Sequence, residues 1–169
     1  MSQRSEQLAK RIEEGARGLA TFTSALSEQE WQTPVSATDR RTVGVVVHHV
    51  ASMYPLEIEV ARKVAGGNSV TEVTAEVVNQ INAEHAGKHT QAGKSETLEL
   101  LRNNSRAAAD AVRALTDEDL DRAAPFGLSF GAPVTAQFVI EDHALRHSWH
   151  HLARIRKALG KEAEAARNR

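Results

Sequence analysis

Apolar residues recur at helical spacing along most of the chain. From residue 4 to residue 26 they return every third or fourth position, with charged residues on the opposite side, which is the pattern of an amphipathic helix. The same pattern predicts helices at residues 42–65, 95–115 and 133–159, and a shorter helix at residues 70–88. The sequence therefore predicts an all-α fold, a four-helix bundle with one extra short helix.

Capping and helix-breaking residues mark the ends of the second helix. Thr42 is a suitable N-cap, and Gly66 and Gly67 form a stop signal. Pro55 lies inside this helix, and we expect a kink there because proline removes one backbone hydrogen bond. Residues 27–41, which precede the helix, are expected to be a connector.

The segment at residues 121–133 contains two prolines and two glycines, and we expect it to be irregular. Pro133 suits the first turn of the last helix. The segment could close over one end of the bundle and bring Phe126 or Phe130 near a substrate. The tail at residues 160–169 is expected to be frayed.

The connection between the second and third main helices is unusually long. It has about thirty residues, whereas antiparallel neighbours in bundles are joined by roughly 2–8. Such a crossover allows the two helices to run parallel. The length, 169 residues, suits one domain over residues 1–169 with its core at about 8–159.

Charge and composition exclude several classes of function. The 21 Lys and Arg residues balance 22 Asp and Glu residues, so we expect neither nucleic-acid binding nor a polybasic membrane anchor. The absence of cysteine excludes disulfides and thiolate metal ligands. No apolar run approaches the ~18 residues of a membrane span, and the charged N-terminus is unlike a signal peptide. We expect a cytoplasmic protein.

The histidines carry the candidate chemistry. His147 and His151 are four residues apart in a predicted helix, so they lie one turn apart on one face and can hold one metal ion. A third ligand must come from another helix, and His48 and His49 lie in the other strongly apolar one. Spacing alone does not choose between these two. The eight histidines fall into three groups: His48 and His49; His85 and His89; His143, His147, His150 and His151.

The remaining histidines of the last helix have less certain roles. His143 lies one turn before His147 and could be a ligand, a partner of a ligand or a residue at the rim of the site. His150 points away from that face and is expected to be exposed. Glu141 and Asp142 could orient a histidine N–H, although ordinary solvated helix charges would look the same.

His85 and His89 also stand four residues apart, but Gly87 lies between them in a polar stretch. We interpret this pair as a solvated helix end. The alternative is a role at the mouth of the metal site.

Three stretches together resemble the DinB-like (DinB/YfiT-like) metalloenzyme family, which includes low-molecular-weight thiol-dependent transferases. They are TVGVVVHHVASMY, LTDEDLDRAAPFG and RHSWHHLARIR, and the resemblance spans roughly Leu8 to Leu159. The first motif places a metal ligand at His49 and not at His48. The last places the other two ligands at His147 and His151.

The resemblance implies a bundle with parallel second and third helices and a divalent metal, most often zinc or nickel, held by three histidines. Two positions depart from the family. Ser52 stands where the family often has Asp, and Arg154 stands where it often has Gln. These departures bear on thiol-transferase activity more than on metal binding.

We therefore expect a metal-dependent enzyme, a thiol-dependent transferase or isomerase or a hydrolase, that acts on a small molecule such as a low-molecular-weight thiol. The ligands imply no particular catalytic side chain. The alternatives are a non-catalytic metal-binding or stress-associated protein, and a bundle whose histidines bind no metal. A homodimer is also expected, because the chain has few aromatic residues and its Ala- and Val-rich helix faces could pair.

Overall fold

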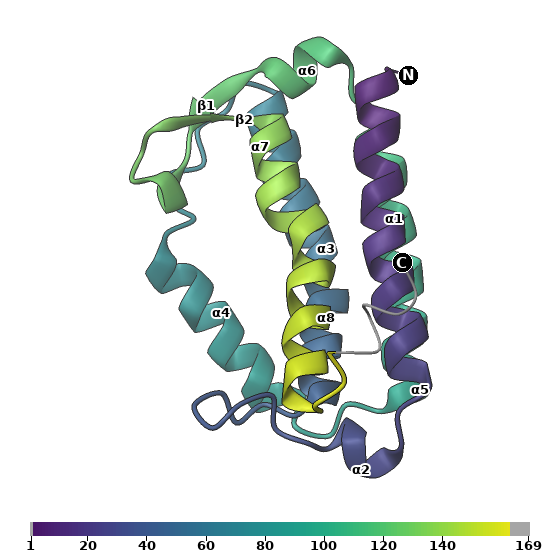
Figure 1. Ribbon diagram of the computed structural model, residues 1–169. Coiled ribbons are helices and arrows are strands. Elements are labelled where there is room, and N and C mark those ends of the chain that lie inside the picture. Colours follow the sequence, from purple (N-terminus) through teal and green to yellow (C-terminus); the bar gives the residue numbers. More distant parts are fainter. Residues whose placement is uncertain (1, 163–169) are drawn as a thin grey trace.

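The computed structural model describes residues 2–162 and consists mainly of a four-helix bundle (Figure 1). The last helix of the bundle is continuous but has three parts, with a π-helical turn, η2, between α7 and α8. The predicted fold class is confirmed. The bundle helices are α1 (Gln3–Ser24), α3 (Val43–Ala65), α5 (Lys94–Arg113) and the last helix, formed by α7 (Ala136–Ile140), η2 (Glu141–Leu145) and α8 (Arg146–Ala158).

Shorter elements connect these helices. Residues 27–41, predicted as a connector, include one short helix whose cap is Ser27, a residue that accepts a hydrogen bond from the backbone of Glu30. The segment predicted to be irregular holds a two-stranded antiparallel sheet. The shorter elements are α2 (Glu28–Trp31), α4 (Ala75–Lys88), α6 (Asp117–Asp121), β1 (Ala123–Pro125), η1 (Gly127–Ser129) and β2 (Pro133–Thr135).

The long crossover produces the expected parallel pair. α3 and α5 pack against each other and run in the same direction, opposite to α1 and the last helix (Figure 1). The crossover contains α4, which lies outside the bundle beside α3. α4 therefore forms an outer wall beside the bundle.

α3 continues through Pro55 without interruption. Proline lacks the N–H that would bond the carbonyl four residues earlier, at Ala51. The side chain of Asn104 on α5 donates to that carbonyl at 2.9 Å. A neighbouring helix thus satisfies the acceptor that the proline leaves free.

The extra short helix begins later than its apolar pattern predicted. Val70 is fully buried outside the helix, where its N–H donates to Pro125 O at 2.9 Å and its carbonyl accepts from Gly127 N at 3.0 Å. Thr74 then caps α4. The tertiary pairing with the β1 segment removes these residues from the helix.

The start of the last helix is a second correction. Pro133 was predicted in its first turn, but it pairs with Pro125 in the small sheet. The helix begins only at Ala136, where Thr135 accepts a hydrogen bond from Phe138 N. At its far end, Gly160 has φ 64° and follows the end of α8. Most of the predicted frayed tail, residues 163–169, lies outside the described residues.

None of the helices among residues 2–162 is both long enough and apolar enough to cross a membrane.

Gly44, in the first turn of α3, is required by its contact with Trp31. A Cβ atom at Gly44 would lie 2.3 Å from Trp31 Nε1, and that nitrogen donates to Ala92 O at 2.8 Å. We expect Gly44→Ala to lower the free energy of unfolding by about 1–3 kcal/mol, because the buried indole must move. Urea unfolding measures this change.

Gly87→Ala is the matched control, since a Cβ atom there meets nothing within 4 Å. This helical position should gain up to about 1 kcal/mol. Equal effects of the two substitutions would contradict the assignment of Gly44 to a close contact.

Candidate metal centre

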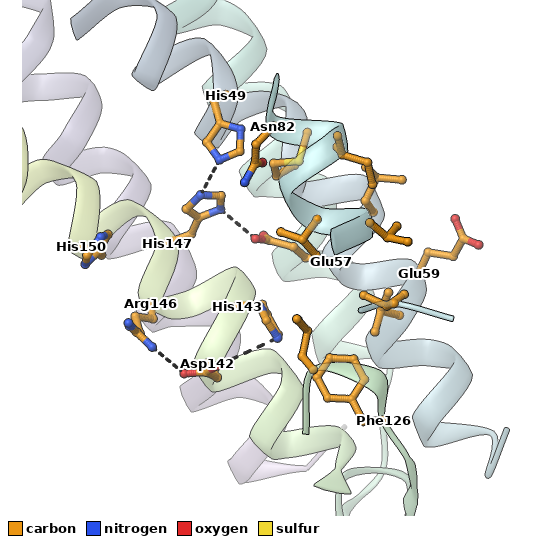
Figure 2. Close-up of a pocket in the computed structure, with 18 of the residues that line it drawn as sticks. His49, Glu57, Glu59, Asn82, Phe126, Asp142, His143, Arg146, His147 and His150 are labelled. Carbon is orange, nitrogen blue, oxygen red and sulfur yellow. Dashed lines mark hydrogen bonds and ion pairs between the residues drawn. The ribbon is translucent and has the colours of Figure 1, made fainter. Parts of the chain in front are cut away.

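The structure brings His49, His147 and His151 together. His49 comes from α3, and the other two come from successive turns of α8. The Nε2 atoms of His49 and His147 are 3.2 Å apart (Figure 2). Each of the three side chains offers a ring nitrogen, and these nitrogens lie within 4.8 Å of one another. We call this group the inner triad.

Burial keeps His49 and His151 of the inner triad neutral. His49 and His151 are only 5% and 6% exposed. Loss of hydration, with a smaller contribution from His147, lowers the pKa of His49 to about 3 and that of His151 to about 2. Both rings are therefore uncharged at neutral pH, which is the form of histidine that binds a metal.

Glu57 fixes the orientation of His147. Its Oε1 lies 2.7 Å from His147 Nδ1 (Figure 2), although the geometry of this contact is not that of a hydrogen bond. With Nδ1 turned toward the carboxylate, Nε2 is directed at His49. A carboxylate behind a ligand histidine fixes the ring and raises its basicity.

The sequence pattern did not identify Glu57 as a partner of the triad. The available signal was an acidic residue eight positions after His49 in a strongly apolar helix. Instead, Glu141 and Asp142 were considered as orienting groups, and neither contacts the inner triad. Glu141 lies 3.8 Å from Arg11, and Asp142 bonds Arg146 at 2.7 Å.

The inner triad fits a divalent transition metal. Nδ1 of His49 and Nδ1 of His151 are buried and have no hydrogen-bond partner, so the three rings do not form a self-sufficient hydrogen-bond network. Three imidazole nitrogens are a ligand set used for zinc, nickel, copper and iron, while magnesium and calcium prefer oxygen.

A cavity of about 590 Å³ lies beside the inner triad, between α3, α4 and the last helix. Its walls are chiefly apolar, and α4 provides the outer one. Polar side chains line it as well, among them Glu57, His143 and Asn82 (Figure 2). The apolar lining consists of Met53, Leu56, Val60, Val73, Val77, Val78, Ile81, Phe126 and Leu128.

The two phenylalanines expected near the substrate have different positions. Phe126 is buried and lines the cavity, with its ring centroid 5.7 Å from that of His143. Phe130 is fully exposed and is not part of the lining. The loop therefore contributes one aromatic wall.

His143 lies in the π-helical turn η2, next to the cavity. Its Nε2 is buried and has no hydrogen-bond partner, with Asp142 Oδ2 4.0 Å away. π-helical turns within α-helices are frequent at functional sites. His143 is thus a candidate substrate contact, whereas His150 is exposed, as expected.

The interpretation of His85 and His89 as a solvated helix end is wrong for His85. That ring is only 7% exposed and lies against His48, with His85 Nε2 2.8 Å from His48 Nδ1. The cause is the packing of α4 on α3, which local sequence does not show. The three residues His48, His85 and His89 form a second group, the outer triad.

The two positions that depart from the family pattern lie outside the lining of the cavity. The hydroxyl of Ser52 lies 3.2 Å from His48 Nδ1. Arg154 binds Asp39 at 3.0 Å, and neither residue lines the cavity.

Comparisons with known proteins agree with this fold. The family model described as the DinB superfamily matches residues 11–155. Among solved structures, the chain is similar to YfiT from Bacillus subtilis, described as a probable metal-dependent hydrolase with an unusual four-helix bundle topology. The two are 19% identical with a TM-score of 0.73, over 94% of this chain and 87% of that one. No curated protein matches the chain in sequence.

Glu57→Gln should weaken zinc binding roughly 10–100-fold, because the neutral amide polarises His147 less than a carboxylate does. Glu59→Gln is the matched control, since Glu59 is exposed and forms an ion pair with Lys63 on the same helix. Calorimetric titration of the metal-free protein measures both. Equal zinc affinities in the two variants would show that Glu57 does not contribute to the metal site.

The metal-free protein should lose stability as the pH falls from about 6.5 toward 3. The folded state lowers the pKa of His49 to about 3, so in this range the unfolded chain binds protons that the folded chain does not. Each such group contributes a slope of up to about 1.4 kcal/mol per pH unit.

Urea unfolding at a series of pH values measures this slope. The double variant His49→Gln, His151→Gln should show a shallower dependence. An unchanged slope in that variant would assign the acid sensitivity to other groups.

Proposed function

The chain belongs to the DinB superfamily, and from this premise we propose that it is a metal-dependent enzyme, a hydrolase of a small molecule that has an apolar body. The observation that carries the proposal is the inner triad, His49, His147 and His151, whose ring nitrogens converge beside a cavity of about 590 Å³. Three histidines are a common ligand set of catalytic zinc sites.

The proposed ligands leave room for a reactant, since three protein ligands do not complete the coordination of a zinc-class ion. When bound, the divalent ion, zinc or nickel, supplies a Lewis acid that lowers the pKa of a coordinated water or thiol. Neutral imidazoles suit this task because they do not cancel the charge of the ion.

The chain's own side chains supply orientation and proton transfer. Glu57 Oε1 holds His147, while Glu57 Oε2 is buried without a hydrogen-bond partner and can accept a proton near the cavity. His143 Nε2 is likewise unpaired and can bind a polar group of the substrate. The apolar walls of α3 and α4 enclose the rest of the substrate and exclude water.

The nucleophile distinguishes two reaction types. The unpaired oxygen of Glu57 favours activation of water, and hence hydrolysis, because an oriented carboxylate can take the proton of a water molecule. Thiol-dependent transfer would use the same ligands with a low-molecular-weight thiol as second substrate.

The test is an activity screen of the purified protein with small esters, amides and thiol–electrophile pairs. We expect a hydrolytic activity that a chelator abolishes and that zinc or nickel restores. His147→Asn should lower kcat/KM at least about 100-fold, since a ligand is lost. Lys157→Gln, a change of an exposed residue on the same helix that does not line the cavity, should retain full activity.

If activity appeared only in the presence of a thiol, the proposed reaction would be thiol transfer and not hydrolysis. No metal in elemental analysis of the native protein, together with full activity of His147→Asn, would reject the proposal altogether.

A further inference from the structure

The outer triad connects α4 to the bundle. His48 comes from α3, His85 from the last turn of α4, and His89 from the C-cap of that helix. The three side chains each offer one ring nitrogen, and these nitrogens lie within 4.8 Å of one another. The His48 and His89 rings stack with centroids 4.1 Å apart, and the His85 centroid lies 4.7 Å from that of His89.

Few other contacts fix α4 to the bundle. Of its residues, all of which the structure describes, only His85 is buried. Val77 and Ile81, which a helix would normally bury, are 39% and 36% exposed along the cavity. The helix therefore lacks the continuous apolar stripe that usually fixes a helix to a core. His85 joins it to α3 through the contact of its Nε2 with His48 Nδ1 at 2.8 Å.

Hydrogen bonds alone do not satisfy the outer triad. The Ser52 hydroxyl donates to His48 O at 2.8 Å, so it has no proton left for His48 Nδ1. The facing pair of His48 Nδ1 and His85 Nε2 can share one proton. In either tautomer His85 Nδ1 stays buried without a partner. Buried polar atoms in a complete hydrogen-bond network normally have a partner.

The surroundings of the outer triad favour a cation. The group lies at the C-terminus of α4, where unpaired carbonyl groups carry partial negative charge. The charge of the nearby cation Arg41 is partly offset by Asp39, which accepts from its Nε at 2.9 Å and from its Nη2 at 2.7 Å and which Arg154 shares at 3.0 Å. Imidazole nitrogens select a zinc-class ion over magnesium or calcium.

We propose that His48, His85 and His89 form a second binding site for a zinc-class divalent cation, distinct from the inner triad, and that this ion fixes α4 against α3. Small rotations of the rings would bring their nitrogens to the spacing of about 3.4 Å that ligands have around a tetrahedral zinc ion. Since α4 carries the outer wall of the cavity, occupation of the outer triad would also fix the shape of the substrate site.

The two sites should have distinguishable affinities. The rings of His49 and His85 are in edge-to-face contact, with centroids 5.4 Å apart, so two bound cations would repel each other. His48 and His89 are also more exposed than His49 and His151. The outer triad should therefore bind the weaker, exchangeable ion.

The experiment is a calorimetric titration of the metal-free protein with Zn²⁺, with stoichiometry checked by elemental analysis. The native protein should bind two equivalents. His89→Gln should weaken the second equivalent at least about tenfold and leave the first unchanged, while His147→Gln should weaken the first. His150→Gln, the matched control outside both triads, should bind two equivalents as tightly as the native protein.

These variants separate this proposal from the proposed function. A single equivalent in the native protein, lost in His147→Gln and retained in His89→Gln, would overturn the second site and leave the inner one intact. Two equivalents of unchanged affinity in His89→Gln would also overturn it. Circular dichroism of each metal-free variant verifies that the helices are retained.

Hydrogen exchange tests the link to α4. Zn²⁺ should slow amide exchange across residues 75–88 in the native protein and in His147→Gln, but not in His89→Gln. Exchange in α4 that does not respond to Zn²⁺ in His147→Gln would refute the claim that the outer ion fixes this helix.

Discussion

The burial of α3 between α5 and the last helix is the constraint on which the rest of the structure depends. Most apolar residues of α3 are in the core, so the rotation of this helix about its axis is fixed by hydrophobic burial. That rotation decides where two consecutive histidines point. His49 is directed at the last helix and His48 at α4.

The polar groups of this apolar helix are satisfied from outside it. Asn104 bonds the carbonyl of Ala51 that Pro55 leaves without a donor, and Tyr54 shares a hydrogen bond with Ser148 at 2.7 Å in the core. Both contacts join α3 to its neighbours, because a buried donor or acceptor without a partner costs free energy. The histidines are therefore held by a rigid scaffold, as a metal site requires.

The two triads lie on different faces of α3. The inner triad joins α3 to α8 and lies beside the cavity, while the outer triad joins α3 to α4, the outer wall. In our proposals the inner ion performs the chemistry and the outer ion sets the position of the wall. A core made largely of Ala and Val has few aromatic contacts with which to fix a peripheral helix, and metal ligation would take that role.

Helical periodicity, caps and the length of the crossover were enough to predict the bundle, because amphipathic patterning and loop length are local properties of the chain. The spacing of His147 and His151 predicted their common face for the same reason, and the family motif singled out His49. Local pattern could not predict the partner of each buried polar group. The role of Glu57, the burial of His85 and the π-helical turn around His143 all depend on neighbours distant in sequence. So do the hydrogen bonds of Val70 with Pro125 and Gly127 and the pairing of Pro133 with Pro125, which hold these residues outside the helices. Only the tertiary structure decided these features, because the cost of burying a backbone or side-chain polar group is offset by whichever partner the packing brings near.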